Sequence, residues 1–257
     1  MKIGLALGGG ATRGMAHLGV LSVLVDSGIP IDFVAGCSAG SVIGAVYCAG
    51  IPVEEMKKMA VNVRWRRVAS RNRSQWGFVS FAKLERWLMM VLGDLDFSDL
   101  KMPLAIVTTD ALTGERVVLQ KGRLAKAVHA SCSVPGIVQP VQVDDRLLMD
   151  GGIVDNLPVS AARELGADYV IGADVFEPDY QRQGGPLARG AAAIETLIRH
   201  AGGGFGSADF LITPNTAGRS FIRFSRHHEL ISLGEEAASR SLPALEESIA
   251  KAERSNI

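Results

Sequence analysis

This chain has no net charge, few cysteines and no long apolar runs. Its 27 basic residues equal its 27 acidic residues, so the formal net charge is +0, which argues against a general nucleic-acid-binding protein. Its three cysteines follow no zinc-binding spacing and are too few for a disulfide scaffold, which favours a reducing compartment. No uninterrupted apolar run reaches about 18 residues, so the sequence predicts no transmembrane helix and we expect a cytoplasmic protein.

Short apolar segments, by contrast, are abundant. Apolar residues make up 47% of the 257 residues, which is enough for a sizeable core. Strand-like and helix-like patterns alternate along the first half, as is typical of a mostly parallel sheet with helices on both faces. We find no internal repeat. The sequence therefore predicts one α/β domain over residues 1–257, with a three-layer α/β/α architecture.

The expected elements follow from periodicity and from the positions of glycine and proline. Strands are predicted at Ile3–Leu7, Asp32–Ala35, Leu104–Thr109, Val117–Gln120, Val141–Val143, Arg146–Met149, Tyr169–Val175 and Phe210–Thr213. Helices are predicted at Arg13–Ser27, Ala39–Cys48, Val53–Val61, Ser80–Leu92, Leu124–Ala130 and Val159–Leu165, with a last helix after His228. The polar, glycine-rich stretches Pro178–Gly190 and Ala201–Gly206 are expected to be loops or mobile flaps.

The most informative motif is Gly36-Cys37-Ser38-Ala39-Gly40, which lies between a predicted strand and a predicted helix. This pattern is typical of a nucleophile elbow, a tight turn that exposes the serine hydroxyl. The glycines are needed because the chain passes close to itself, where a Cβ would clash. The alternative is an ordinary turn in which Ser38 caps the next helix. Cys37 is expected to point away from the site into the core.

A glycine-rich loop, Gly8-Gly9-Gly10-Ala11-Thr12-Arg13-Gly14, joins the first predicted strand to the first helix. Its backbone amides can hold a phosphate or a transient oxyanion, or the loop can be a plain turn. A P-loop needs Gly-Lys-Ser/Thr where this chain has Arg13-Gly14-Met15, and a dinucleotide loop needs glycine at position 13. Beside a nucleophilic serine, an oxyanion hole is the preferred interpretation.

A nucleophilic serine also needs a group that accepts its proton. The five histidines lie in contexts that mark none of them as a triad member: His17, His129, His200, His227 and His228. A better candidate is Asp150, which ends an apolar strand and precedes Gly151-Gly152. The alternative for Asp150 is a common Asp-Gly turn.

Three motifs in order resemble the patatin-like phospholipases, and most closely a bacterial branch similar to the catalytic domain of neuropathy target esterase. They are Gly8-x-Gly10-x-x-Arg13-Gly14, Gly36-x-Ser38-x-Gly40 and Asp150-Gly151-Gly152. Further matching stretches are 130–136, 155–158 and 165–168. The resemblance runs from Ile3 to about the final helix. It is weakest at residues 61–80 and after Pro178.

The resemblance implies a patatin-like fold and a catalytic dyad, with Ser38 as nucleophile and Asp150 as its only partner. It implies oxyanion donors at Gly9, Gly10 and Ala11, and no metal or organic cofactor. The supporting motif residues are Gly8, Arg13, Gly14, Gly36, Gly40, Gly151 and Gly152. Because an ordinary aspartate has a pKa of about 3.9, a dry site must raise the pKa of Asp150 before it can act as a base. For Arg13 a structural role is preferred over headgroup binding.

The segment from Lys57 to Leu84 has eight basic residues and no acidic ones. Its arginines cluster around Trp65 and Trp76: Arg64, Arg66, Arg67, Arg71 and Arg73. Such a segment suits an anionic lipid surface, nucleic acid, or a solvated flap without a partner. Nucleic acid is the weakest of these because the whole chain is neutral.

These observations favour a serine lipid acyl hydrolase that acts on a phospholipid, lysophospholipid or other fatty acyl ester. Its expected location is the cytoplasm, with peripheral contact at the inner membrane face. A second hypothesis is a regulatory or binding protein that keeps the hydrolase scaffold. A third, ranked far behind, is a nucleotide-dependent oxidoreductase built on residues 8–14.

Overall fold

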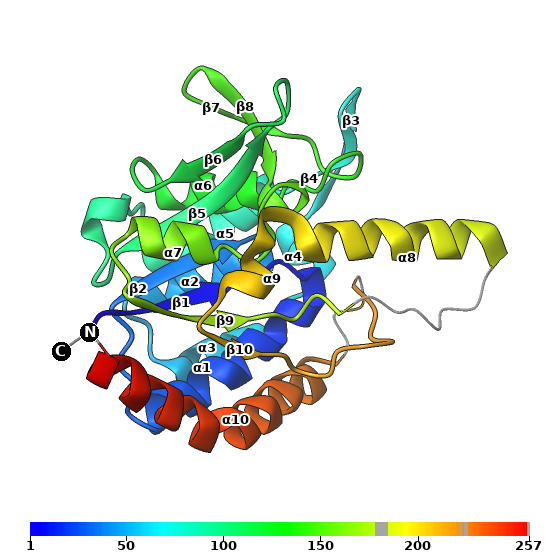
Figure 1. Cartoon of the computed structure of the whole chain (residues 1–257). Coiled ribbons are helices and arrows are strands. Elements are labelled where there is room, and N and C mark those ends of the chain that lie inside the picture. Colours follow the sequence, from blue (N-terminus) through cyan, green and yellow to red (C-terminus); the bar gives the residue numbers. More distant parts are fainter. Residues whose placement is uncertain (178–184, 222, 224–225, 256–257) are drawn as a thin grey trace.

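A mixed sheet forms the centre of the chain in a computed structural model, which describes residues 1–177, 185–221, 223 and 226–255 (Figure 1). The strands are β1 (Ile3–Leu7), β2 (Phe33–Cys37), β5 (Leu104–Asp110), β6 (Arg116–Leu119), β7 (Val141–Val143), β8 (Arg146–Asp150), β9 (Tyr169–Ala173) and β10 (Phe210–Ile212). Their order is β10-β9-β1-β2-β5-β8-β7, with β6 also paired to β5. Neighbours from β10 to β5 are parallel, whereas β6 and β8 run antiparallel to β5 and β7 runs antiparallel to β8.

Helices cover both faces of this sheet. They are α1 (Ala16–Asp26), α2 (Ala39–Cys48), α3 (Val53–Ala60), α4 (Trp65–Val68), α5 (Ala82–Leu92), α6 (Leu124–Ser131), α7 (Val159–Glu164), α8 (Gly185–His200), α9 (Gly204–Ser207) and α10 (His227–Ser255). Short 3₁₀ turns are η1 (Ala11–Met15), η2 (Phe97–Asp99), η3 (Gly151–Ile153) and η4 (Ala201–Gly203). A separate hairpin consists of β3 (Ser70–Ser74) and β4 (Gly77–Ser80).

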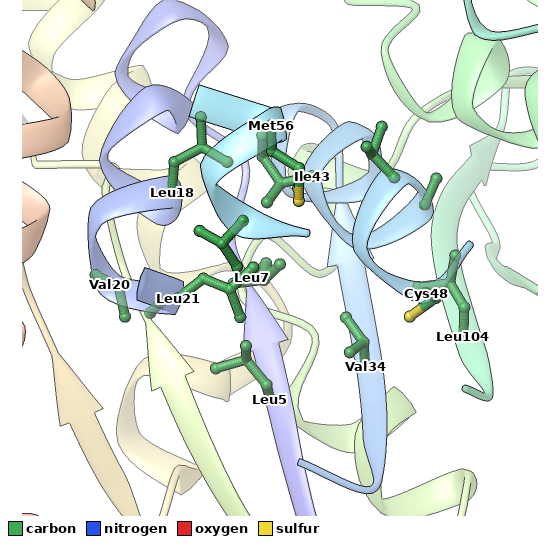
Figure 2. Packing of buried hydrophobic residues seen from close by; sticks show 14 of the residues in the cluster. Leu5, Leu7, Leu18, Val20, Leu21, Val34, Ile43, Cys48, Met56 and Leu104 are labelled. Carbon is green, nitrogen blue, oxygen red and sulfur yellow. The ribbon is translucent and has the colours of Figure 1, made fainter. Parts of the chain in front are cut away.

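The alternation of side chains along β1 explains the two layers. Leu5 and Leu7 face the larger core, where Figure 2 shows them beside side chains of α1 and α2. Ala6 points to the opposite face and joins the smaller cluster that includes α7. Since successive side chains of a strand point to opposite faces, large residues fill one layer and alanines let α7 pack close on the other.

Helix α10 is held against α1 by two glycines. A Cβ on Gly19 would lie 2.0 Å from the Ile231 carbonyl oxygen, and one on Gly234 would lie 2.0 Å from that of Ala16. The two helices therefore meet backbone to backbone, and a side chain at either glycine would push them apart. This contact fixes the last helix on the same face of the sheet as α2, which follows the candidate elbow.

The structure confirms the α/β class, the mostly parallel strands and both predicted hairpins, β5–β6 and β7–β8. The expected helix at Arg13–Ser27 is in fact η1 followed by α1, because the tight glycine loop continues into a 3₁₀ turn. The expected helix at Ser80–Leu92 begins only at Ala82, after strand β4. No helix in the described ranges is both long and apolar enough to cross a membrane.

The expectation of a loop at Pro178–Gly190 is wrong for its second part. Residues 178–184 lie outside the described residues, but residues 185–190 form the start of helix α8. Its glycines suggested a loop, yet the alanines and leucines around them favour helix and prevail. The Ala201–Gly206 stretch likewise contains η4 and the start of α9 rather than a simple loop.

Candidate active site

Ser38 stands between the end of β2 and the start of α2, on a strained turn. Its φ is 50° and its ψ is −119°, a conformation that residues other than glycine rarely adopt. The Ser38 side chain makes no capping hydrogen bond to α2, so the interpretation of Ser38 as a helix cap is wrong. Instead the backbone carbonyl of Ser38 accepts hydrogen bonds from the amide and hydroxyl of Ser41, at 2.9 and 2.6 Å.

The two glycines of the elbow are required by close backbone contacts. A Cβ on Gly40 would lie 2.0 Å from the Leu7 carbonyl oxygen, and one on Gly36 would lie 2.7 Å from that of Gly40. Real Cβ atoms do not approach oxygen so closely. The elbow is therefore pressed against the carboxyl end of β1, where the glycine-rich loop begins.

Asp150 reaches Ser38 from a strand far away in the sequence. Strand β8 pairs antiparallel with β5 and ends at Asp150, which lies opposite Thr108. Ser38 Oγ donates a hydrogen bond of 2.6 Å to Asp150 Oδ2, and the amide of Gly152 donates one of 2.8 Å to Oδ1. Ser38 is only 8% exposed and Asp150 only 6%. Both oxygens of the carboxylate are thus fixed before any substrate binds.

Burial changes the chemistry of this carboxylate. Desolvation raises the pKa of Asp150 from 3.8 to about 6, against a smaller lowering by hydrogen bonds from Ser38, Gly152 and Cys37. A buried carboxylate is harder to ionise, which makes its ionised form a stronger proton acceptor. Above about pH 6 this aspartate is therefore ionised and still more basic than an ordinary one.

Two hydroxyl groups that the sequence did not single out hold the backbone of this pair. Ser131 Oγ, fully buried at the end of α6, accepts from the Ser38 amide at 2.8 Å and donates to the Val107 carbonyl at 2.7 Å. Thr109 Oγ1 donates to the Asp150 carbonyl at 2.9 Å. The only sequence signal for Ser131 was its place in the matching stretch 130–136.

The glycine-rich loop lies against Ser38, but two of its backbone amides already donate hydrogen bonds within the fold. The Gly8 and Gly9 amides donate to the carbonyls of Ala173 and Asn156, at 3.1 and 3.0 Å. The expectation that Gly9 supplies an oxyanion donor therefore disagrees with this geometry. What the site needs at Gly9 is the absence of a side chain, since a Cβ there would lie 2.5 Å from Asn156 Oδ1.

Asn156 is a further polar residue between the two halves of the site. It is 1% exposed, and its Oδ1 lies 2.5 Å from where a Cβ of Gly9 would stand and 3.1 Å from one of Gly152. Its Nδ2 has no hydrogen-bond partner among the described residues. Because buried donors are normally paired, an unpaired one near the candidate nucleophile makes Asn156 a candidate for the functional site. The sequence included Asn156 in a matching stretch without a role.

Arg13 has the structural role that was preferred for it. It is fully buried, and its guanidinium donates to the Arg219 carbonyl at 2.9 and 2.7 Å and to the Glu177 carbonyl. The guanidinium also lies 3.7 Å from the centre of the Phe221 ring. Arg13 thus anchors η1, and with it the glycine-rich loop, to chain segments after β9 and before α10.

Two histidines that could have served as base are engaged elsewhere. His17 Nε2 lies 2.8 Å from the Gly8 carbonyl oxygen, and burial lowers the pKa of His17 to about 4, so it stays neutral. His129 Nδ1 lies 2.8 Å from Glu85 Oε2. Within the described residues, no group of three or more His, Cys, Asp or Glu side chains converges in a way that could hold a metal.

Cys37 is part of the core as expected, but it does not point away from the site. It is buried, and its Sγ lies 3.9 Å from Asp150 Oδ1. The reason is that Asp150 is itself buried, so its Oδ1 lies on the core side of the turn, near the Cys37 side chain. All three cysteines of the chain are free.

The basic segment lies on the surface. Its arginines are all exposed on or beside α4 and β3: Arg64, Arg66, Arg67, Arg71 and Arg73. Nearby Phe78 on β4 is 75% exposed. The segment thus combines cations with an exposed aromatic ring.

Comparisons with known proteins identify the family. The sequence pattern of the patatin-like phospholipases matches residues 5–163, so the chain belongs to this family. An NTE family protein of Mycobacterium tuberculosis is 36% identical over 173 residues, which cover 66% of this chain and 48% of the relative. Lysophospholipase NTE1 of Yarrowia lipolytica is 35% identical over 183 residues, which cover 69% of this chain and 13% of the relative.

The fold is found among solved structures as well. The crystal structure of VipD from Legionella pneumophila matches 95% of this chain and 66% of that protein, with a TM-score of 0.55 and 14% sequence identity. The chain spans about half the length of the mycobacterial relative and about an eighth of the yeast one.

Proposed function

We propose that this chain is a serine lipid acyl hydrolase that cleaves carboxylic esters through an acyl-Ser38 intermediate. The observation that carries the proposal is the 2.6 Å hydrogen bond from Ser38 Oγ to a buried carboxylate. Membership of the patatin-like phospholipase family supports a lipid ester as substrate. The yeast relative is named a lysophospholipase, which places a single-chain phospholipid among the substrates to test.

In the first half of the reaction, Ser38 Oγ attacks the ester carbonyl carbon and its proton moves to Asp150 Oδ2. Asp150 then gives this proton to the leaving alcohol, which departs while the acyl group stays bound to Ser38 Oγ. In the second half, a water molecule attacks the acyl carbonyl carbon and gives its proton to Asp150. The bond from that carbon to Ser38 Oγ then breaks, Asp150 returns the proton to Ser38 Oγ, and the fatty acid leaves. The hydrogen bond from Gly152 to Oδ1 keeps Oδ2 aimed at the serine throughout.

The negative oxygen that forms in each attack needs donors that are already in place. We assign these to the backbone amides of Gly10 and Ala11, at the start of η1, and to the side-chain amide of Asn156. Each such donor typically lowers the barrier by about 3–4 kcal/mol. Gly9 contributes by leaving room for the Asn156 side chain rather than by its amide.

In this proposal residues 1–257 act as one hydrolase domain on the cytoplasmic side of a membrane. The exposed arginines around Trp65 and Trp76 would favour anionic lipid, because basic residues with aromatic neighbours bind such surfaces. Equal binding to neutral and anionic vesicles would speak against this electrostatic contact.

A fluorophosphonate probe tests the nucleophile directly, because it forms a covalent bond with activated serines only. We expect labelling of the intact chain on Ser38 and none in Ser38→Ala. Ser133→Ala serves as control, since that buried hydroxyl donates to the His129 carbonyl and does not reach Ser38. A folded chain that takes no label would contradict the proposal and favour a binding or regulatory role on the same scaffold.

A further inference from the structure

Helix α8 extends away from the body of the molecule (Figure 1). The structure describes all of its residues, and none of them is buried. Leu187, Ile194 and Leu197 are 90%, 59% and 73% exposed. Their spacing places them along one stripe of the helix, together with the exposed small residues Gly190 and Ala193. The stripe is thus apolar where a surface helix is normally polar.

On the side of α8 that faces the protein, an ion pair holds the helix in its orientation. Arg199 Nε lies 2.8 Å from Asp174 Oδ2, and Asp174 has a side chain only 2% exposed. The Arg199 guanidinium also lies 4.4 Å from the centre of the Phe205 ring. Rotation of the helix to bury its leucines would leave Asp174 as an unpaired buried charge, which is strongly unfavourable. The outward direction of the stripe is therefore fixed.

The same helix ends at the candidate active site. A Cβ on Gly152 would lie 3.7 Å from Ile198 Cγ2, and Gly152 is the residue whose amide holds Asp150. Ile153, the next residue in η3, is itself 41% exposed. Exposed apolar residues thus lie both at the turn that holds the aspartate and along the helix that packs against this turn.

We propose that the outer face of α8 seats the protein on a lipid surface and so brings fatty acyl esters to Ser38. This inference rests on the proposed function. An exposed apolar stripe on a helix with a basic residue beside it, here Arg189, is typical of helices that lie in a bilayer interface. A protein partner fits less well, because three side chains on one helix fall far short of the roughly 800 Å² per partner that stable interfaces bury.

Vesicle binding of a triple variant tests this surface. Leu187→Ser/Ile194→Ser/Leu197→Ser removes the stripe, and Met90→Ser on α5 is the matched control because Met90 is 77% exposed. Co-sedimentation uses vesicles of ether-linked phosphatidylcholine and phosphatidylglycerol in equal parts, which the protein cannot hydrolyse. We expect binding to weaken about 10-fold or more in the triple variant and less than about 2-fold in the control. Equal binding of the triple variant and the intact chain would overturn the proposal.

A second variant tests the same surface through a new fluorescence signal and not through a loss of binding. Ile194→Trp places an additional fluorescent side chain on the stripe, and vesicles with brominated acyl chains should quench its fluorescence beyond any quenching seen in the intact chain. Sedimentation-velocity measurements without lipid test the other possibility, which is that a second copy of the chain covers the stripe. A dimer that the triple variant abolishes, together with no added quenching in Ile194→Trp, would assign the face to a second copy and overturn the proposal.

The proposed role of α8 and the proposed hydrolysis at Ser38 can be refuted independently of each other. Fluorophosphonate labelling of Ser38 needs no lipid, whereas binding to ether lipid needs no catalysis. Normal labelling with vesicle binding unchanged in the triple variant would leave the hydrolase in place and remove the role of α8. Loss of vesicle binding in a chain that never labels would support the surface and contradict the proposed hydrolysis.

Discussion

The Ser38–Asp150 pair and helix α8 are built in opposite ways. Backbone contacts fix each part of the pair, from the strained turn at Ser38 to the Gly152 amide on Asp150. Helix α8, by contrast, has its large apolar side chains in solvent and is held by a charged pair at one end. Catalysis needs atoms fixed within fractions of an ångström, whereas a lipid surface needs only exposed apolar area. Substitutions in the two regions should therefore have different signatures.

The largest effect is expected from Asp150→Asn. An amide cannot accept the Ser38 proton, so hydrolysis of a water-soluble acetate ester should fall by about a thousandfold or more. Turnover measured under steady state checks this. Residual activity within about tenfold of the intact chain would point to a different base.

The free energy of unfolding provides the control for Asp150→Asn, because it should increase while the hydrolytic activity decreases. Burial raises the folded-state pKa of Asp150 to about 6, so the folded chain binds more protons than the unfolded chain between about 3.8 and 6. The buried ionised form therefore costs stability above pH 6, by up to about 3 kcal/mol, and this cost disappears as the pH falls. Urea unfolding should show Asp150→Asn to be more stable than the intact chain above pH 6.

Asn156→Leu should have the next largest effect. It keeps the volume and the backbone carbonyl that binds Gly9 but removes the unpaired Nδ2 donor. Loss of an oxyanion donor lowers kcat by about 100-fold with little change in KM. If KM rises and kcat stays constant, Asn156 binds substrate and does not stabilise the oxyanion.

Ser131→Ala should act less strongly, through the backbone of the nucleophile. Without the Ser131 hydroxyl the Ser38 amide is left buried and unpaired, and the elbow can shift, so we expect about a tenfold loss in kcat. Tyr169→Phe is the control, because it removes a hydrogen bond to Ser248 at the opposite end of the sheet. Both variants should lose about 1 kcal/mol of stability, and only Ser131→Ala should lose turnover.

The smallest effect is expected on the exposed basic segment. Arg71→Gln removes one surface charge, worth about 1 kcal/mol at an anionic membrane, so vesicle binding should weaken about fivefold. Labelling of Ser38 should not change. An equal loss of binding to neutral vesicles would show that Arg71 acts by packing and not by charge.

The catalytic motifs could be predicted from the sequence because their constraints are local. Gly36 and Gly40 are needed by contacts within one turn, and that need is visible as a pattern of residue types. Asp150 was recognisable because it joins a strand end to two glycines. The meeting of Asp150 with Ser38 came from family resemblance, since β8 reaches β5 only in the folded chain.

The supporting residues could not be predicted because their roles depend on tertiary contacts. Ser131 is one of many serines, and only the packing of α6 brings it to the Ser38 amide. The use of the Gly9 amide by Asn156 is equally invisible in the sequence. Helix α8 was missed since its glycines suggested a loop, and the Arg199–Asp174 pair that orients it joins residues 25 positions apart.

The pH dependence of Ser38 labelling tests the central claim most directly. If Asp150 is the base, the labelling rate should rise with pH and level off above an inflection near the pKa of about 6, because only the ionised carboxylate accepts the proton. The inflection should vanish in Asp150→Asn. An inflection that survives in Asp150→Asn, and disappears instead when a histidine is replaced, would contradict a dyad of serine and aspartate.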